Sequence, residues 1–168
     1  FFTALYTEAL FLFLGTSAMY FLSKKNWLMV AAMAFFAAMT REVGGMLLFP
    51  ILYVVWMDKK PLLRPGKIFA AISPILGVLM VLGIYYVASG DPLIFLAKHS
   101  EFGKTMSLPH VPIIDAITGL FSGGFAGIYH AWNLFSLIFT IILTYYAYKL
   151  LPKQYFIYCV AVLLPGLL

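Results

Sequence analysis

The sequence predicts an all-α fold, a multi-pass transmembrane helical bundle. Long apolar runs alternate with short charged segments, 64% of the 168 residues are hydrophobic, and the mean hydropathy is +0.99. Soluble globular domains are only about 45–50% apolar. A membrane β-barrel would alternate polar and apolar residues within segments of about ten. Continuous apolar runs therefore favour helices that cross a bilayer.

About six membrane segments follow from the positions of these runs, because a hydrocarbon core about 30 Å thick needs about 20 helical residues. We expect them at residues 4–22, 27–39, 43–57, 68–88, 129–148 and 155–168. The chain opens without Met and stops inside an apolar run. We therefore interpret residues 1–168 as a single transmembrane domain, a fragment that is incomplete at both ends.

The charges predict an orientation. Basic residues gather in alternate gaps between the apolar runs, at Lys24, Lys25, Lys59, Lys60, Arg64, Lys67, Lys149 and Lys153. Cytoplasmic loops of membrane proteins are rich in Lys and Arg. We therefore expect these gaps in the cytoplasm and the N-terminus outside it, in a bacterial or archaeal plasma membrane or the ER membrane. The net charge of +5 is then a topology signal, and nucleic acid is not an expected partner.

The second apolar run predicts a recessed charged turn on the outer side. Residues 27–39 would span only about 20 Å as a helix, less than the hydrocarbon thickness of about 30 Å. Thr40, Arg41 and Glu42 follow this run, and Glu8 falls about one turn into the first segment. Charged groups within a membrane domain usually face a bundle interior or a wet cavity.

Two interpretations of these charges stay open. The first is an outward-facing polar pocket for an anionic or polyhydroxylated substrate. The second is that Glu8 and Arg41 snorkel to the interface or pair to hold two helices together. The glycines Gly44 and Gly45 directly after the turn permit either a tight hairpin or a close helix approach.

The longest polar stretch, residues 89–127, is predicted to be an extracytoplasmic loop that contains an amphipathic helix. Asp91 before Pro92 is a typical helix N-cap, and Phe95, His99 and Phe102 follow with helical spacing. This helix would lie in the outer interface, either as an anchor or as a roof over a pocket. His99 has no second histidine at ligand spacing, and the single cysteine, Cys159, lies in an apolar run, so no metal site is expected.

Three motifs occur in an order typical of one enzyme family. They are YTEALF at residues 6–11, AMTREVG at 38–44 and GDPLIF at 90–95. In these features the chain resembles the GPI-mannosyltransferase-2-like (PIG-V-like) integral membrane glycosyltransferases, over about residues 1–115. Glu42 departs from the family pattern, which has Ser or another small polar residue at this position.

The resemblance implies a GT-C fold and the transfer of a sugar, expected to be mannose, from a polyprenyl- or dolichyl-phosphate donor. The acceptor would be a lipid or glycan on the extracytoplasmic face. Such enzymes carry an essential Asp in an earlier outer loop, so we expect the main catalytic base upstream of Phe1.

The site residues can be assigned on this basis. Arg41, with Thr40, would bind the donor phosphate, because a guanidinium matches phosphate oxygens bidentately and stays charged. Glu8 is the candidate to assist the base. The remaining expected substrate-binding residues are Tyr6, Thr7, Glu42, Asp91 and His99. A divalent cation on these carboxylates is an alternative, but scattered oxygens do not specify a cofactor site.

Two other function classes compete with the enzyme. A transporter or flippase for a lipid-linked or anionic solute would also need recessed charges, although such proteins often contain inverted repeats, and no convincing repeat occurs here. A structural membrane subunit would use its charges only to set topology. Retention of sugar transfer after replacement of Arg41 would argue against the role assigned to this residue.

Overall fold

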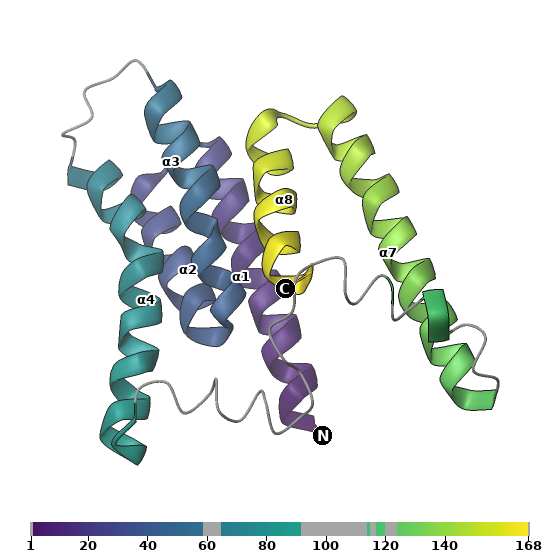
Figure 1. The fold of residues 1–168 in the computed structure, drawn as a ribbon. Helices are drawn as coiled ribbons and strands as arrows, with labels where there is room; N and C mark the ends of the chain where they lie inside the picture. Colours follow the sequence, from purple (N-terminus) through teal and green to yellow (C-terminus); the bar gives the residue numbers. More distant parts are fainter. Residues whose placement is uncertain (1, 59–64, 92–113, 115–116, 120–123, 168) are drawn as a thin grey trace. The chain divides into compact units, whose positions relative to one another are not determined.

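A computed structural model describes the backbone of residues 2–58, 65–91, 114, 117–119 and 124–167. The side chains of residues 2–6, 42, 125–126 and 164–167 are outside the description. The described elements are helices throughout, so the predicted all-α class is confirmed (Figure 1). They are α1 (Phe2–Ser23), α2 (Trp27–Thr40), the 3₁₀ helix η1 (Glu42–Leu47), α3 (Leu48–Met57), α4 (Pro65–Ser89), α7 (Gly124–Leu150) and α8 (Lys153–Leu167).

Two of these helices are long and apolar enough to cross a membrane, at Pro65–Ser89 and Gly127–Leu150. The other apolar helices of the described residues are shorter, at Thr7–Ser23, Trp27–Thr40, Val43–Met57 and Lys153–Leu163. A 14-residue α-helix such as α2 is only about 21 Å long. The count of six membrane segments therefore stays a prediction.

The chain divides into two compact units, Phe1–Gly103 and Lys104–Leu168. The predicted outer amphipathic helix that follows Asp91, and His99 within it, lie outside the described residues. The single domain and the outer loop at residues 89–127 accordingly stay predictions.

In the first unit, α2 packs against both α1 and α4. The helix α1 ends in a Schellman motif: the N–H of Lys25 donates to Leu22 and that of Asn26 to Phe21, with Lys25 at a positive φ of 56°. The Asn26 side chain then accepts from the backbone N–H of Met29 and caps α2. Consecutive caps thus turn the chain back within three residues.

Small residues bring α2 and α4 together. Ala34, Ala37 and Ala38 are buried on α2, and Gly77 is buried on α4. A Cβ atom added to Gly77 would lie 2.5 Å from the carbonyl oxygen of Phe35 and 2.8 Å from the Cβ atom of Ala38. Only glycine fits this crossing, which is the use of small residues typical of close helix packing in membranes.

The second unit contains the antiparallel pair α7 and α8, joined at Leu151 and Pro152. The rings of Tyr148 and Phe156 meet edge to face at 5.1 Å across this pair. Part-buried Thr140 and Thr144 donate their hydroxyl hydrogens to backbone carbonyls four residues earlier, so that neither hydroxyl donor is left unsatisfied.

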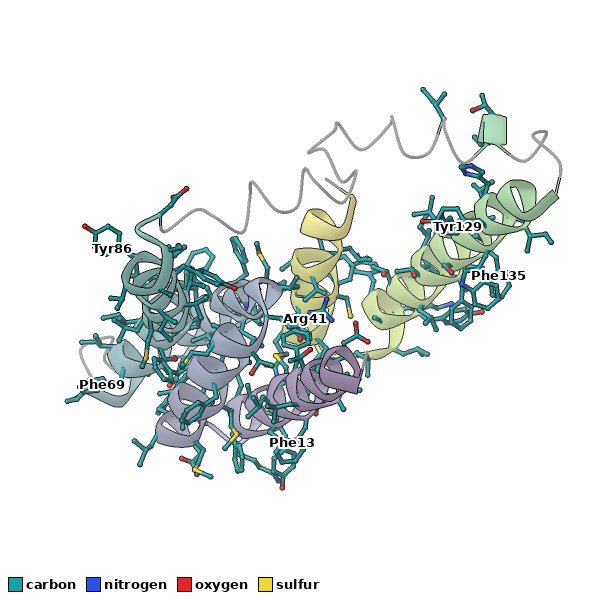
Figure 2. All side chains as sticks on the ribbon, turned by 90° about the horizontal axis from the view of Figure 1, so that it is seen from below. Phe13, Arg41, Phe69, Tyr86, Tyr129 and Phe135 are labelled. Carbon is teal, nitrogen blue, oxygen red and sulfur yellow. The ribbon has the colours of Figure 1, made fainter. Side chains whose placement is uncertain are left out.

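Large apolar side chains cover the outside of both units. Phe13, Phe69 and Tyr86 of the first unit project outward in Figure 2, as do Tyr129 and Phe135 of the second. Each of these side chains is more than half exposed. Soluble monomers rarely expose such large contiguous apolar areas, so this surface fits a lipid or protein environment.

Candidate functional site

The candidate site centres on an ion pair between Arg41 and Glu8. The guanidinium Nη1 donates a hydrogen bond of 2.8 Å to the carboxylate Oε1, and both side chains are exposed, at 43% for Arg41 and 61% for Glu8. Glu8 lies near the start of α1, and Arg41 directly follows α2. The structure thus brings together two residues that are 33 positions apart in the sequence.

Local backbone geometry places Arg41 at this point. Its N–H donates to the carbonyl of Ala37 at 3.1 Å, and its own carbonyl accepts from Gly44 at 2.8 Å. The Arg41 backbone is extended, with φ −148° and ψ 143°, which ends α2 before η1 begins. A side chain at Gly44 would collide with the backbone of Ala37 and Ala38. The glycine therefore makes this tight reversal sterically feasible.

A small pocket lies beside the turn, between the end of α2 and the second half of α4. Its volume is about 100 Å³, and its lining combines apolar residues with the polar Thr40, Arg41 and Tyr85; the apolar ones are Ala38, Met39, Val78, Val81 and Leu82. The Thr40 hydroxyl donates to the carbonyl of Phe36 at 2.7 Å. Its oxygen keeps lone pairs that can accept a hydrogen bond from a ligand.

Two helices extend past the turn. The helix α4 continues from Tyr85, which lines the pocket, to Ser89, and α1 begins six residues before Glu8. Four further residues of α-helix correspond to about 6 Å. Figure 1 shows α1 and α4 reaching beyond the connection between α2 and α3 at this end. Within the first unit, Arg41 is therefore recessed relative to the ends of its neighbours.

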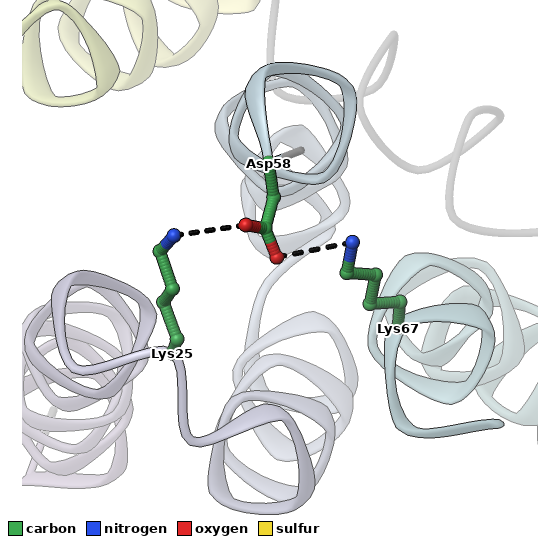
Figure 3. A network of polar contacts seen from close by, with 3 residues as sticks. All are labelled: Lys25, Asp58 and Lys67. Carbon is green, nitrogen blue, oxygen red and sulfur yellow. Dashed lines mark hydrogen bonds and ion pairs between the residues drawn. The ribbon is translucent and has the colours of Figure 1, made fainter. Parts of the chain in front are cut away.

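A second polar cluster, formed by Lys25, Asp58 and Lys67, lies at the other end of α2 (Figure 3). The Asp58 carboxylate pairs through Oδ1 with Lys25 and through Oδ2 with Lys67, each at 3.0 Å. The side chain of Asp58 is 5% exposed and that of Lys67 is 0% exposed. The Lys67 ammonium also lies 5.8 Å from the ring centroid of Trp27, within cation–π range.

This cluster changes the acidity of Asp58. The hydrogen bond from Lys25 and then the close contact with the Lys67 ammonium lower the pKa of the Asp58 carboxyl from 3.8 to about 2, against an opposing effect of burial. Asp58 directly follows α3, and Lys67 lies in the first turn of α4. The cluster therefore ties the α1–α2 turn to the end of α3 and the start of α4.

The structure describes part of the predicted site. Arg41, Thr40 and Glu8 lie at one end of the first unit, and Thr7 directly precedes Glu8 and is exposed. Asp91 is exposed and lies two residues past the end of α4, where its N–H donates to the Ser89 hydroxyl at 3.4 Å. The side chains of Tyr6 and Glu42, and the whole of His99, lie outside the described residues.

Sequence reasoning missed the α4 side of the pocket. Val78, Val81, Leu82 and Tyr85 have the spacing of a single helical face. That spacing is visible in the sequence, but nothing there identifies which face of α4 meets the end of α2. Among the residues that the structure describes, no group of three His, Cys, Asp or Glu side chains could hold a metal ion.

Comparison with protein-family models, with curated proteins and with solved structures finds no match to this chain. A function must therefore be inferred from the site itself. Chemically, the site offers a cation and a hydroxyl that line a mostly apolar pocket, and a carboxylate that pairs with the cation. This combination suits an anionic headgroup attached to an apolar chain.

Proposed function

We propose that the chain is part of a multi-pass membrane glycosyltransferase, a GT-C-type hexosyltransferase resembling the PIG-V-like family. It would move a sugar, expected to be mannose, from a polyprenyl- or dolichyl-phosphate donor to a lipid or glycan acceptor on the extracytoplasmic face. The observation that carries this proposal is the recessed Arg41, which lines a mostly apolar pocket together with Thr40 and pairs with Glu8.

The separation of charges along α2 supports the proposed orientation. Arg41 and Glu8 lie at one end of this helix, and the Lys25–Asp58–Lys67 cluster lies at the other. Fourteen residues of α-helix separate the two ends by about 21 Å. With the lysine-rich end in the cytoplasm, as the positive-inside rule favours, the Arg41 end faces the compartment in which polyprenyl-phosphate sugars would be used.

The proposed chemistry uses the properties of each side chain. When the glycosidic bond to phosphate breaks, negative charge grows on the departing phosphate, and Arg41 would stabilise it through paired N–H donors. Thr40 can add one hydrogen bond. Glu8 would bind a sugar hydroxyl and assist the base that deprotonates the acceptor.

The size of the pocket limits what it could hold. Its volume of about 100 Å³ is below the roughly 300–1,000 Å³ of complete ligand sites. We therefore expect it to receive only the region around the phosphate. The apolar chain of the donor would continue along apolar helix surfaces such as the exposed half of α4.

Replacement of Arg41 in the full-length protein tests the proposal. Transfer of radiolabelled mannose from a mannosyl polyprenyl phosphate would be measured in membranes, with Arg41→Ala, Arg41→Lys and the unchanged protein at matched abundance. We expect Arg41→Ala to lower the transfer rate about 10²-fold or more. Arg41→Lys should retain part of the rate, because it keeps the charge but loses the bidentate geometry.

A matched control is Lys24→Ala, which removes an exposed cation before the start of α2. It should leave transfer unchanged. Equal transfer by Arg41→Ala and the unchanged protein would contradict the proposed role of Arg41. Intact transfer together with lost movement of a lipid-linked solute across the membrane would instead indicate a transporter.

A further inference from the structure

We infer that Glu8 competes with the donor phosphate for Arg41 and so lowers the affinity of the site for this phosphate. In this inference, which rests on the proposed function, phosphate binding exchanges one partner of the guanidinium for another. Arg41 leaves the Glu8 carboxylate and pairs with the phosphate, while the freed carboxylate turns to a hydroxyl of the substrate.

The geometry supports a competition. Arg41 Nη1 and Glu8 Oε1 are in direct contact at 2.8 Å, so the cation is already neutralised before any ligand arrives. Among the carboxylates whose side chains the structure describes, Glu8 is the one in an ion pair with Arg41, whereas Asp58 pairs with lysines at the other end of α2. An incoming anion must therefore displace Glu8 or share the guanidinium with it.

The exposure of the pair lowers the free-energy cost of the exchange. Both side chains are substantially exposed, and ion pairs exposed to water contribute little net stability. A phosphate offers a guanidinium two parallel charge-assisted hydrogen bonds. Arg41 should therefore bind phosphate in preference to Glu8. The net gain in binding free energy is smaller than it would be if Arg41 had no partner to lose.

The Asp58 cluster shows the opposite behaviour in the same unit. Asp58 has two lysine partners, and its side chain and that of Lys67 are shielded from solvent. Breaking a shielded pair leaves an uncompensated buried charge, so this carboxylate would not exchange partners with a ligand. The contrast indicates that Glu8 holds Arg41 reversibly, whereas Asp58 holds Lys67 permanently.

The exchange makes the effect of Glu8 depend on the charge of the ligand. A neutral lipid cannot displace Glu8, since it offers the guanidinium no charge, and a weakly charged anion gains less than a phosphate. Removal of Glu8 should thus change the affinity for polyprenyl phosphates and leave that for uncharged polyprenols unchanged. Once released from Arg41, the Glu8 carboxylate can accept hydrogen bonds from a sugar hydroxyl through either of its oxygens.

Binding measurements on four forms of the full-length protein test the inference: the unchanged protein, Glu8→Gln, Arg41→Gln and the double variant. The probe is undecaprenyl phosphate in detergent micelles, and undecaprenol serves as the uncharged control. We expect Glu8→Gln to tighten phosphate binding by about two- to fivefold, as loss of an exposed ion-pair competitor implies. It should leave undecaprenol binding unchanged.

The double variant separates a local exchange from a general change in charge. In the Arg41→Gln background, Glu8→Gln should no longer tighten binding, because the residue for which Glu8 competes is absent. Equal tightening in both backgrounds would overturn the exchange. Weaker binding of undecaprenyl phosphate by the single variant Glu8→Gln would also overturn it, because Glu8 would then be a direct ligand. Unchanged affinity in Arg41→Gln would instead overturn the proposed phosphate site itself.

Discussion

The carboxylate Oδ2 of Asp58 lies 3.0 Å from the Nζ of Lys67, a lysine whose side chain is completely buried within the unit. A buried ammonium without a counter-charge is strongly unfavourable. Oδ1 of the same carboxylate pairs with the exposed Lys25. Asp58 therefore makes the burial of Lys67 tolerable and joins three segments of the chain.

Replacement of Asp58 should destabilise the protein far more than replacement of Lys25. Asp58→Asn leaves Lys67 charged and buried, so we expect the melting temperature to fall by roughly 10 °C. Lys25→Gln removes only a partly exposed partner and should lower it by a few degrees at most. Thermal unfolding of the purified protein in detergent measures both, and similar small shifts would show that Lys67 does not depend on Asp58.

The same residue predicts an acid-sensitive component of stability. The pKa of Asp58 is lowered from 3.8 to about 2 in the folded protein. Its contribution is therefore complete above about pH 4 and is lost as the pH falls from 4 to 2. Melting curves recorded between pH 2 and pH 6 should show the unchanged protein and Asp58→Asn converging at the acid end. Parallel curves over the whole range would contradict this assignment.

The sequence is sufficient to predict the helices but not this cluster. The apolar runs at residues 4–22, 27–39 and 68–88 lie within α1, α2 and α4, because charged residues, turn formers and caps interrupt the hydrophobic pattern at the right places. In the sequence, Lys67 is only one basic residue of an expected cytoplasmic loop. Its burial beside Asp58 and Trp27 results from the packing of three segments. The hydropathy pattern along the chain does not predict which segments pack together.

At the candidate site, too, the sequence predicts one part of the arrangement and the other part depends on packing. Length alone indicates that α2 is too short for a full membrane span, and the structure places Arg41 short of the ends of α1 and α4. The pairing of Arg41 with Glu8 is one of two alternatives that the sequence leaves open. Choosing between them requires the relative rotation of α1 and α2, which depends on contacts between helices.

The close approach of α2 and α4 should depend on Gly77. An added methyl group would overlap the Phe35 carbonyl and the Cβ of Ala38, so we expect Gly77→Ala to lower the free energy of unfolding by about 1–3 kcal/mol. Gly83 in the same helix is the matched control, because a methyl group added there would meet no atom within 4 Å. Gly83→Ala should be neutral or stabilising by up to about 1 kcal/mol. Chemical denaturation of both variants in detergent measures the difference, and equal stability would show that the crossing tolerates a side chain.

Arg41→Ala and Glu8→Ala should each change the free energy of unfolding by less than about 1 kcal/mol, because their ion pair is exposed. A double-mutant cycle on thermal unfolding measures the coupling between them, which we also expect below about 1 kcal/mol. A large coupling would mean that the pair holds α1 and α2 together. The structural alternative would then account for both charges without a ligand.

The proposed orientation predicts which end of the first unit is accessible from outside the cell. In a Cys159→Ser background, a cysteine at Ser89 should react with a membrane-impermeant maleimide added to intact cells, because it lies at the end of α4 nearest Arg41. A cysteine at Ser23, next to the lysine-rich turn, should react only after permeabilisation. Labelling in the reverse order would place Arg41 in the cytoplasm, out of reach of the proposed donor. It would also mean that this chain does not follow the positive-inside rule.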